Sequence, residues 1–160
     1  MKFNSALRNF VLVLFSTLLI SACSTAKKAS VDTVDDVYTG TDTVEYLAKG
    51  VPDRVFFATN KSKLTTRSRD TLRKQATWLR KNKDVTVTVE GHADERGTRE
   101  YNLALGERRG NSVKEFLTSL GVDPGRLTVI SYGKERPAAE GSTSESWAEN
   151  RRAVLVVSGN

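Results

Sequence analysis

Cysteine and histidine are almost absent from this chain, which has one of each, Cys23 and His92, among its 160 residues. A zinc site made of these residue types normally takes three or four ligands, so the sequence argues against such a centre. A single cysteine also excludes an internal disulfide. The sequence contains no internal repeats and no glycine-rich phosphate loop. These absences leave little basis for metal, thiol or nucleotide chemistry.

The chain also has a modest net charge and only one long hydrophobic run. The net charge is +6, from 25 Lys and Arg against 19 Asp and Glu. Lys2 and Arg8 precede the one long apolar run, residues 10–20. Residues 1–22 contain these two basic residues and no acid, so the chain after residue 22 has a net charge of only +4. We therefore expect no nucleic-acid partner. A helix of eleven residues spans about 16 Å, half of a bilayer core, which is too short to cross it and typical of a secretory signal peptide.

The end of that run carries the most specific local pattern. The string Ile20-Ser21-Ala22-Cys23 resembles the lipobox of bacterial lipoproteins, and it puts the only cysteine where the lipobox requires one. The resemblance implies cleavage before Cys23 and attachment of a diacylglycerol and an N-acyl chain to it, with no other cofactor. An ordinary secretory signal followed by a chance cysteine is the alternative.

The rest of the chain divides into two parts by composition. Residues 24–50 are rich in Ser, Thr, Asp and Lys and have no sustained helical or strand period. We therefore predict a signal peptide over 1–22, an acylated cysteine with a flexible tether over 23–50, and one packed domain over 51–160.

Hydrophobic periodicity predicts an α/β fold for the domain, with helices packed on one sheet. Strands are expected at 54–57, 85–90, 127–131 and 153–157, and helices at about 65–81, 99–120 and 144–149. The first helix has a strongly basic outer face. That face is either an ordinary solvated surface or a site of attraction to acidic lipids or an acidic partner.

The loop 91–98 lies between a predicted strand and a predicted helix, where α/β folds often bind ligands. In the following helix Arg109 is four residues from both Leu105 and Val113, which places it on the core-facing side. A buried arginine must be paired, and Asp94 is the nearest candidate in sequence. An arginine fork and a carboxylate together can hold a zwitterion. The alternative is a structural salt bridge that binds nothing.

Two other polar features are less specific. His92 is expected to be a strand-end residue bonded to backbone rather than a catalytic base. The string Asn150-Arg151-Arg152 either balances charge at the start of the last strand or supports a ligand pocket.

Five segments in order resemble the OmpA-like domain family, and within it the peptidoglycan-associated lipoproteins: residues 91–98, 100–102, 104–109, 131–137 and 150–155. The resemblance covers about 54–157 and implies a mixed four-stranded sheet with helices packed on it. It also implies non-covalent binding to meso-diaminopimelate in the peptidoglycan stem. The implied location is the periplasmic face of the outer membrane, and the implied partners in cell division are TolB and other Tol-system proteins.

The resemblance assigns roles to individual residues. Asp94 would take the ammonium group of diaminopimelate and Arg109 its carboxylate. The positions of Arg96 and Thr98 would contact the stem peptide, and Leu105 would line the pocket.

One position departs from the family pattern. Asn60 stands where an acidic residue is usual after the first strand, which puts its part in ligand binding in doubt.

Three other classes of protein are less well supported. A peptidoglycan hydrolase using Asp94 and Glu95 lacks a nucleophile–base pair or metal ligands. A flagellar-stator-type anchor needs a transmembrane helix with an ionisable residue. A nucleic-acid binder conflicts with export and with the mild charge.

Overall fold

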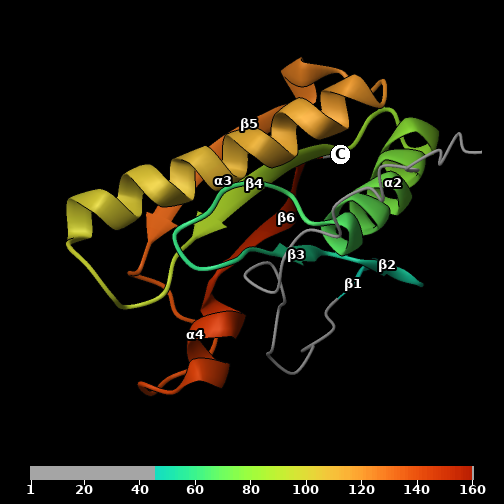
Figure 1. Cartoon of the computed structure of the whole chain (residues 1–160). Coiled ribbons are helices and arrows are strands. Elements are labelled where there is room, and N and C mark those ends of the chain that lie inside the picture. The colour runs from blue at the N-terminus through green and yellow to red at the C-terminus, as the bar shows by residue number, and fades with distance from the viewer. Residues whose placement is uncertain (1–45, 160) are drawn as a thin grey trace, which may run out of the picture. The chain divides into compact units, whose positions relative to one another are not determined.

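The computed structural model describes residues 46–159 (Figure 1). The predicted signal peptide, Cys23 and most of the predicted tether lie outside these residues. Among the helices of the described part, none combines the length and apolar character needed to cross a membrane.

The domain is built on a four-stranded sheet in the order β3-β6-β4-β5. Its strands are β3 (Arg54–Phe56), β4 (Thr86–His92), β5 (Leu127–Gly133) and β6 (Arg152–Gly159). Strands β4 and β5 are parallel, whereas β6 is antiparallel to both β3 and β4. The mixed four-stranded sheet expected from the sequence is thus confirmed.

Three helices accompany the sheet: α2 (Thr66–Lys81), α3 (Arg99–Ser119) and α4 (Ser144–Asn150). Each begins at a threonine whose hydroxyl accepts a backbone N–H three residues on, at Thr65, Thr98 and Thr143. Such caps satisfy N–H groups that the first turn leaves without partners. Helix α3 connects β4 to β5 and lies along both strands (Figure 1). A short 3₁₀ turn, Pro124–Arg126, precedes β5.

The hydrophobic core lies between this sheet and helices α2 and α3. Both helices contribute apolar side chains from one face, and β4 contributes alternate valines. The most deeply buried members are Phe57, Leu72, Ala76, Leu79, Val87, Val89, Val113, Leu117 and Ala153. Burial of this apolar surface is the main favourable contribution to folding.

Glycines bring α3 unusually close to the sheet. A Cβ atom on Gly106 would lie 2.7 Å from the carbonyl oxygen of Gly91 in β4, and one on Gly110 would lie 2.5 Å from Cγ1 of Val129 in β5. Both distances are shorter than side chains normally tolerate. The helix therefore rests directly on the strands, and Arg109, next to Gly110, is carried to the C-terminal end of β4.

A short hairpin precedes the sheet. Strand β1 (Tyr46–Ala48) pairs antiparallel with β2 (Val51–Pro52), and Gly50 takes a positive φ of 76° in the turn. The amide of Gln75 in α2 donates to the carbonyl of Pro52 at 2.6 Å and attaches the hairpin to that helix. Regular structure thus extends back to residue 46, into a stretch where the sequence predicted tether up to residue 50, because a strand of three residues is too short to establish a period.

Candidate functional site

The centre of the candidate site is Arg109, whose side chain is completely buried. Its guanidinium donates three hydrogen bonds to backbone carbonyls: Nε to Lys61 at 2.9 Å, Nη1 to His92 at 2.7 Å and Nη2 to Ala58 at 3.1 Å. Its Cζ atom also lies 5.2 Å from the ring centroid of Phe57. The core-facing position predicted for Arg109 is confirmed, and its partners are main-chain carbonyls.

The charge of Arg109 is retained despite this burial. Loss of hydration lowers the pKa of its guanidinium to about 10, and the nearby charge of Arg151 acts in the same direction. Even so, the group stays protonated at neutral pH. The three carbonyls are neutral, so they satisfy hydrogen bonds without cancelling the positive charge. A guanidinium has five N–H groups, and three of those on Arg109 are engaged in these contacts.

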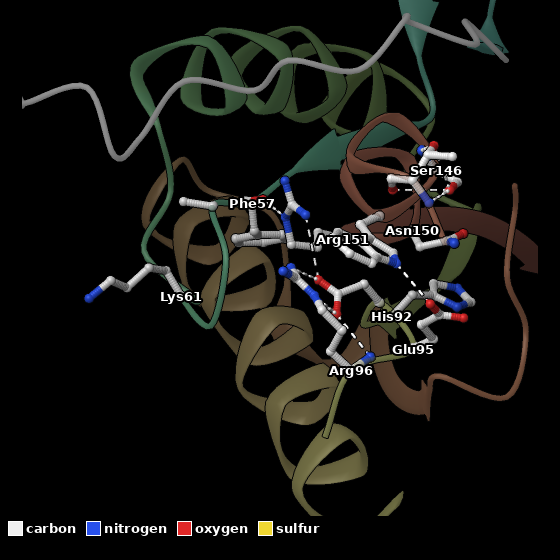
Figure 2. A network of polar contacts seen from close by, with 12 residues as sticks. Phe57, Lys61, His92, Glu95, Arg96, Ser146, Asn150 and Arg151 are labelled. Carbon is white, nitrogen blue, oxygen red and sulfur yellow. Dashed lines mark hydrogen bonds and ion pairs between the residues drawn. The ribbon is translucent and has the colours of Figure 1, made fainter. Parts of the chain in front are cut away.

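Asp94 is also buried, but it pairs with two other arginines. Its carboxylate accepts bonds from Nε and Nη2 of Arg96, at 3.1 and 2.8 Å, and lies 3.5 Å from Nη1 of Arg151. Arg96 and Arg151, which make these contacts, are labelled in Figure 2, where dashed lines mark the hydrogen bonds and ion pairs of the network. The expectation that Asp94 pairs directly with Arg109 is therefore wrong for this structure, because the guanidinium finds carbonyls instead.

Electrostatics keep the Asp94 carboxylate ionised. Burial acts to raise its pKa, but the hydrogen bonds from Arg96 and the charges of Arg96 and Arg151 outweigh burial, so the pKa lies below its usual range. The side chain of Arg96 is 41% exposed. Arg96 is consequently the more accessible member of the pair, because the side chain of Asp94 is only 9% exposed.

The rim of the site is held by contacts between loop 91–98 and the segment around α4. The guanidinium of Arg96 stacks 4.2 Å from the centroid of Trp147, whose indole N–H donates to Glu95 at 3.0 Å. The ammonium of Lys134 donates to the carbonyls of Glu95 and Gly97. Trp147 thus supports the loop by packing and hydrogen bonding.

Comparison with known proteins places these features in a family. The sequence model of the OmpA family matches residues 56–151, which include the whole site. The chain belongs to the OmpA family. Within the described residues, this OmpA domain has no group of three or more His, Cys, Asp or Glu side chains suited to a metal ion.

Relatives of this OmpA-family chain share most of its length. Peptidoglycan-associated lipoproteins of Brucella melitensis and Mesorhizobium japonicum are 41% and 42% identical to it. The alignments cover 92% and 95% of this chain and 90% and 94% of those proteins. The crystal structure of the peptidoglycan-associated lipoprotein from Burkholderia pseudomallei superposes with a TM-score of 0.65 at 38% identity, covering 66% of this chain and 90% of that one.

In this OmpA domain Asn60 shapes the wall of the site. It is exposed and has a positive φ of 57°, a conformation that asparagine tolerates better than most residues. The turn that contains it closes with a hydrogen bond from the N–H of Lys61 to the carbonyl of Ala58. Both residues of that bond also offer carbonyls to Arg109. A backbone role for Asn60 does not need the charge of the usual acidic residue.

The two remaining predicted contacts have visible structural roles. The hydroxyl of Thr98 caps α3 by accepting the N–H of Tyr101 at 3.2 Å, and the residue is exposed at the end of loop 91–98. Leu105, one turn before Arg109, is only 3% exposed. Neither observation tests binding, so contact with a ligand remains a prediction for both.

The structure adds Arg151 to the site. Its Nε donates to the carbonyl of Phe57 at 3.1 Å, and its Nη1 faces Asp94. The string Asn150-Arg151-Arg152 suggested either charge balance or pocket support; Arg151 balances the charge of Asp94, and support of a ligand pocket stays a prediction. Asn150 holds the neighbouring loop by accepting N–H bonds from Ala138 and Ala139.

His92 is neutral and only weakly basic at neutral pH in this environment. Burial, with the charges of Arg152 and other nearby arginines, lowers the pKa of its imidazole to about 3. The ring stacks on Tyr132 at a centroid distance of 5.6 Å. Its contribution to the site is the main-chain carbonyl that accepts from Arg109.

Proposed function

We propose that this domain binds peptidoglycan non-covalently by taking up a zwitterionic group of the stem peptide, chiefly the free end of meso-diaminopimelate. One observation carries the proposal. Among residues 46–159 no carboxylate forms an ion pair with the buried Arg109, whose three acceptors are neutral carbonyls, while the ionised carboxylate of Asp94 lies nearby in the same site.

The two charges suit the two ends of one ligand. A ligand carboxylate would accept N–H groups that Arg109 has not committed to carbonyls, in a charge-assisted bond. A ligand ammonium would replace Arg96 at Asp94. Three arginines, at 96, 109 and 151, surround one carboxylate, so the site as a whole favours the anionic group of the ligand. Arg151 would stay beside Asp94, and the ammonium would take the place that Arg96 leaves when it turns toward solvent.

The wider assignment follows from the relatives and the leader sequence. Proteins that match over nearly the full length are named peptidoglycan-associated lipoproteins. Together with the lipobox at Cys23, this supports a lipid-anchored protein on the periplasmic face of the outer membrane that attaches the membrane to the cell wall. The role we propose is binding without catalysis, and acyl chains on Cys23 are the only covalent additions it requires.

The test compares two substitutions that remove one negative charge each. Asp94→Asn keeps the shape of the side chain, and Glu107→Gln does the same on the exposed surface of α3. A charge-assisted hydrogen bond contributes roughly 1.5–3 kcal/mol, so Asp94→Asn should weaken co-sedimentation with purified sacculi by tenfold or more. Glu107→Gln should bind like wild type.

Competition identifies the ligand group. Free meso-diaminopimelate should displace the protein from sacculi, whereas pimelate, which lacks the amino groups, should not. Folded Asp94→Asn protein that sediments like wild type would contradict the proposal. Equal competition by pimelate would instead mean that the site recognises only the carboxylate of the ligand.

We further propose TolB as a protein partner that uses the same face around loop 91–98. If the two ligands share that face, the affinity for TolB should fall as muropeptide is added. Unchanged affinity at saturating muropeptide would mean separate and uncoupled surfaces.

A further inference from the structure

A second surface of the domain, which shares no lining residue with the proposed peptidoglycan site, is a cationic groove between α2 and the β1–β2 hairpin. We call it the α2 groove; it has a volume of about 400 Å³ and is lined by Val51, Arg73, Lys74, Trp78 and Lys81, among others. The three cationic side chains are exposed, and the indole of Trp78 is half-buried among them. In Figure 1 strand β2 lies beside α2, to which the Gln75 bond attaches it.

The helix that forms this groove is strongly basic. Helix α2 carries six Lys and Arg residues and a single acid, Asp70, which pairs with Arg73. Of the other cations of the groove, Lys74 follows Arg73 directly, and Lys81 lies seven residues, or about two turns, beyond Lys74. An occupant of the groove should therefore be acidic and carry some apolar groups to pack against Trp78.

The chain itself contains a segment of that kind. Residues 29–48 contain five acids and no Lys or Arg, and the acids are Asp32, Asp35, Asp36, Asp42 and Glu45. Between them lie valines and Tyr38. We call residues 32–45, from the first of these acids to the last, the acidic segment. It is followed directly by Tyr46 in β1, and the partner strand of β1 supplies Val51 to the groove wall. Its point of entry is thus beside the groove.

We propose that the acidic segment 32–45 docks in the α2 groove. Its carboxylates face Arg73, Lys74 and Lys81, and its apolar residues pack on Trp78. The net charges of the two partners match, because five acids meet a helix with an excess of five basic charges. The inference uses only the charge, the groove and the chain connection, so it does not rest on peptidoglycan binding.

Docking within one chain needs only weak contacts. Exposed ion pairs contribute about 0.2–1 kcal/mol each and are screened by salt beyond roughly 10 Å at 0.1 M. A short covalent connection raises the effective concentration of the segment to the millimolar range, which compensates for weak individual pairs. We therefore expect docking at low ionic strength and release at high ionic strength.

Docking would change how far the domain reaches from residue 23. At about 3.4 Å per residue, residues 24–45 span up to about 75 Å when extended, whereas residues 24–31 alone span about 27 Å. Ionic strength would then set the free length of chain before the domain.

Zero-length carbodiimide cross-linking of the full chain, in a non-ionic detergent, tests the proposal. This reagent joins a carboxylate to a lysine only when they are in ion-pair contact. We expect peptides that link residues 32–45 to Lys74 or Lys81 within one molecule, with yields at least fivefold lower in 0.5 M than in 0.02 M salt. Lys114 on α3 is the control lysine and should link rarely. The double substitution Arg73→Glu and Lys74→Glu should reduce the links to Lys81 by a similar factor.

Four results would overturn the docking. Links to Lys114 at the same frequency, or links that are insensitive to salt and to the double substitution, would mean random contact. Links only between two molecules would assign the groove to a second copy. If the groove lysines are protected from cross-linking only when anionic phospholipid vesicles are added, the groove binds a lipid surface instead.

Discussion

Substituting Arg109 by lysine tests whether main-chain carbonyls, rather than a carboxylate, hold this side chain. The guanidinium reaches carbonyls of Ala58 and Lys61 in the loop after β3 and of His92 at the end of β4. A lysine ammonium carries the same charge on one nitrogen, so it cannot meet three acceptors arranged around a planar fork. We expect it to keep one of the three bonds.

The cost follows from those contacts. Bonds to a charged group contribute about 1.5–3 kcal/mol each, so losing two predicts a decrease of about 3–6 kcal/mol in the free energy of unfolding. Domains of this size are stabilised by roughly 5–15 kcal/mol in total. The melting temperature should accordingly fall by at least about 10 °C.

Urea unfolding of the full chain measures this free energy, with Arg108→Lys as the control. Arg108 is exposed and its Cζ atom lies 5.9 Å from the ring centroid of Tyr101, so its substitution should change stability by less than about 0.5 kcal/mol. If the two variants unfold at the same urea concentration, the carbonyl contacts do not stabilise the domain and the reasoning fails.

Three other outcomes are expected. The folded-state pKa of Asp94 lies below its usual value of 3.8, so its contribution to stability is present above that pH and is lost as the pH falls further; Asp94→Asn should flatten this part of a urea-unfolding series from pH 2 to 7. Gly106→Ala would place a methyl group against Ser131 and 2.7 Å from the Gly91 carbonyl oxygen, and thermal unfolding should show a loss of about 1–3 kcal/mol. Cys23→Ala should abolish incorporation of labelled palmitate in cells, and label retained by that variant would disprove acylation at Cys23.

Local patterns predicted the elements of the fold well because each had its own physical cause in the sequence. Threonines at positions 65 and 98 cap α2 and α3 as side chains of that type do at helix starts. The strand expected at 85–90 corresponds to β4, whose alternate residues Val87 and Val89 lie in the core. The β1–β2 hairpin was missed because its strands have only three and two residues, too few for any period.

The hydrogen-bond partners of a side chain within the site were harder to predict than the face of the helix on which that side chain lies. Helical spacing correctly put Arg109 on the buried side of α3, yet spacing contains no information on which acceptor it meets there. Its acceptors are carbonyls, which every residue has, so no residue type marks them in the sequence. The glycine contacts that bring α3 against the sheet depend equally on tertiary geometry, although Gly106 and Gly110 at a spacing of four are a visible pattern in retrospect.

The difference between carbonyl and carboxylate partners changes what the site can do. Had Asp94 paired with Arg109, each charge would have cancelled the other, and a ligand would have had to break a buried ion pair. Breaking such a pair costs several kcal/mol. In the observed arrangement Arg109 keeps its charge, and Asp94 is engaged partly by Arg96, which is 41% exposed. Under the proposed function, a zwitterion would have to displace the Arg96 side chain from Asp94, and that side chain is already partly exposed to solvent.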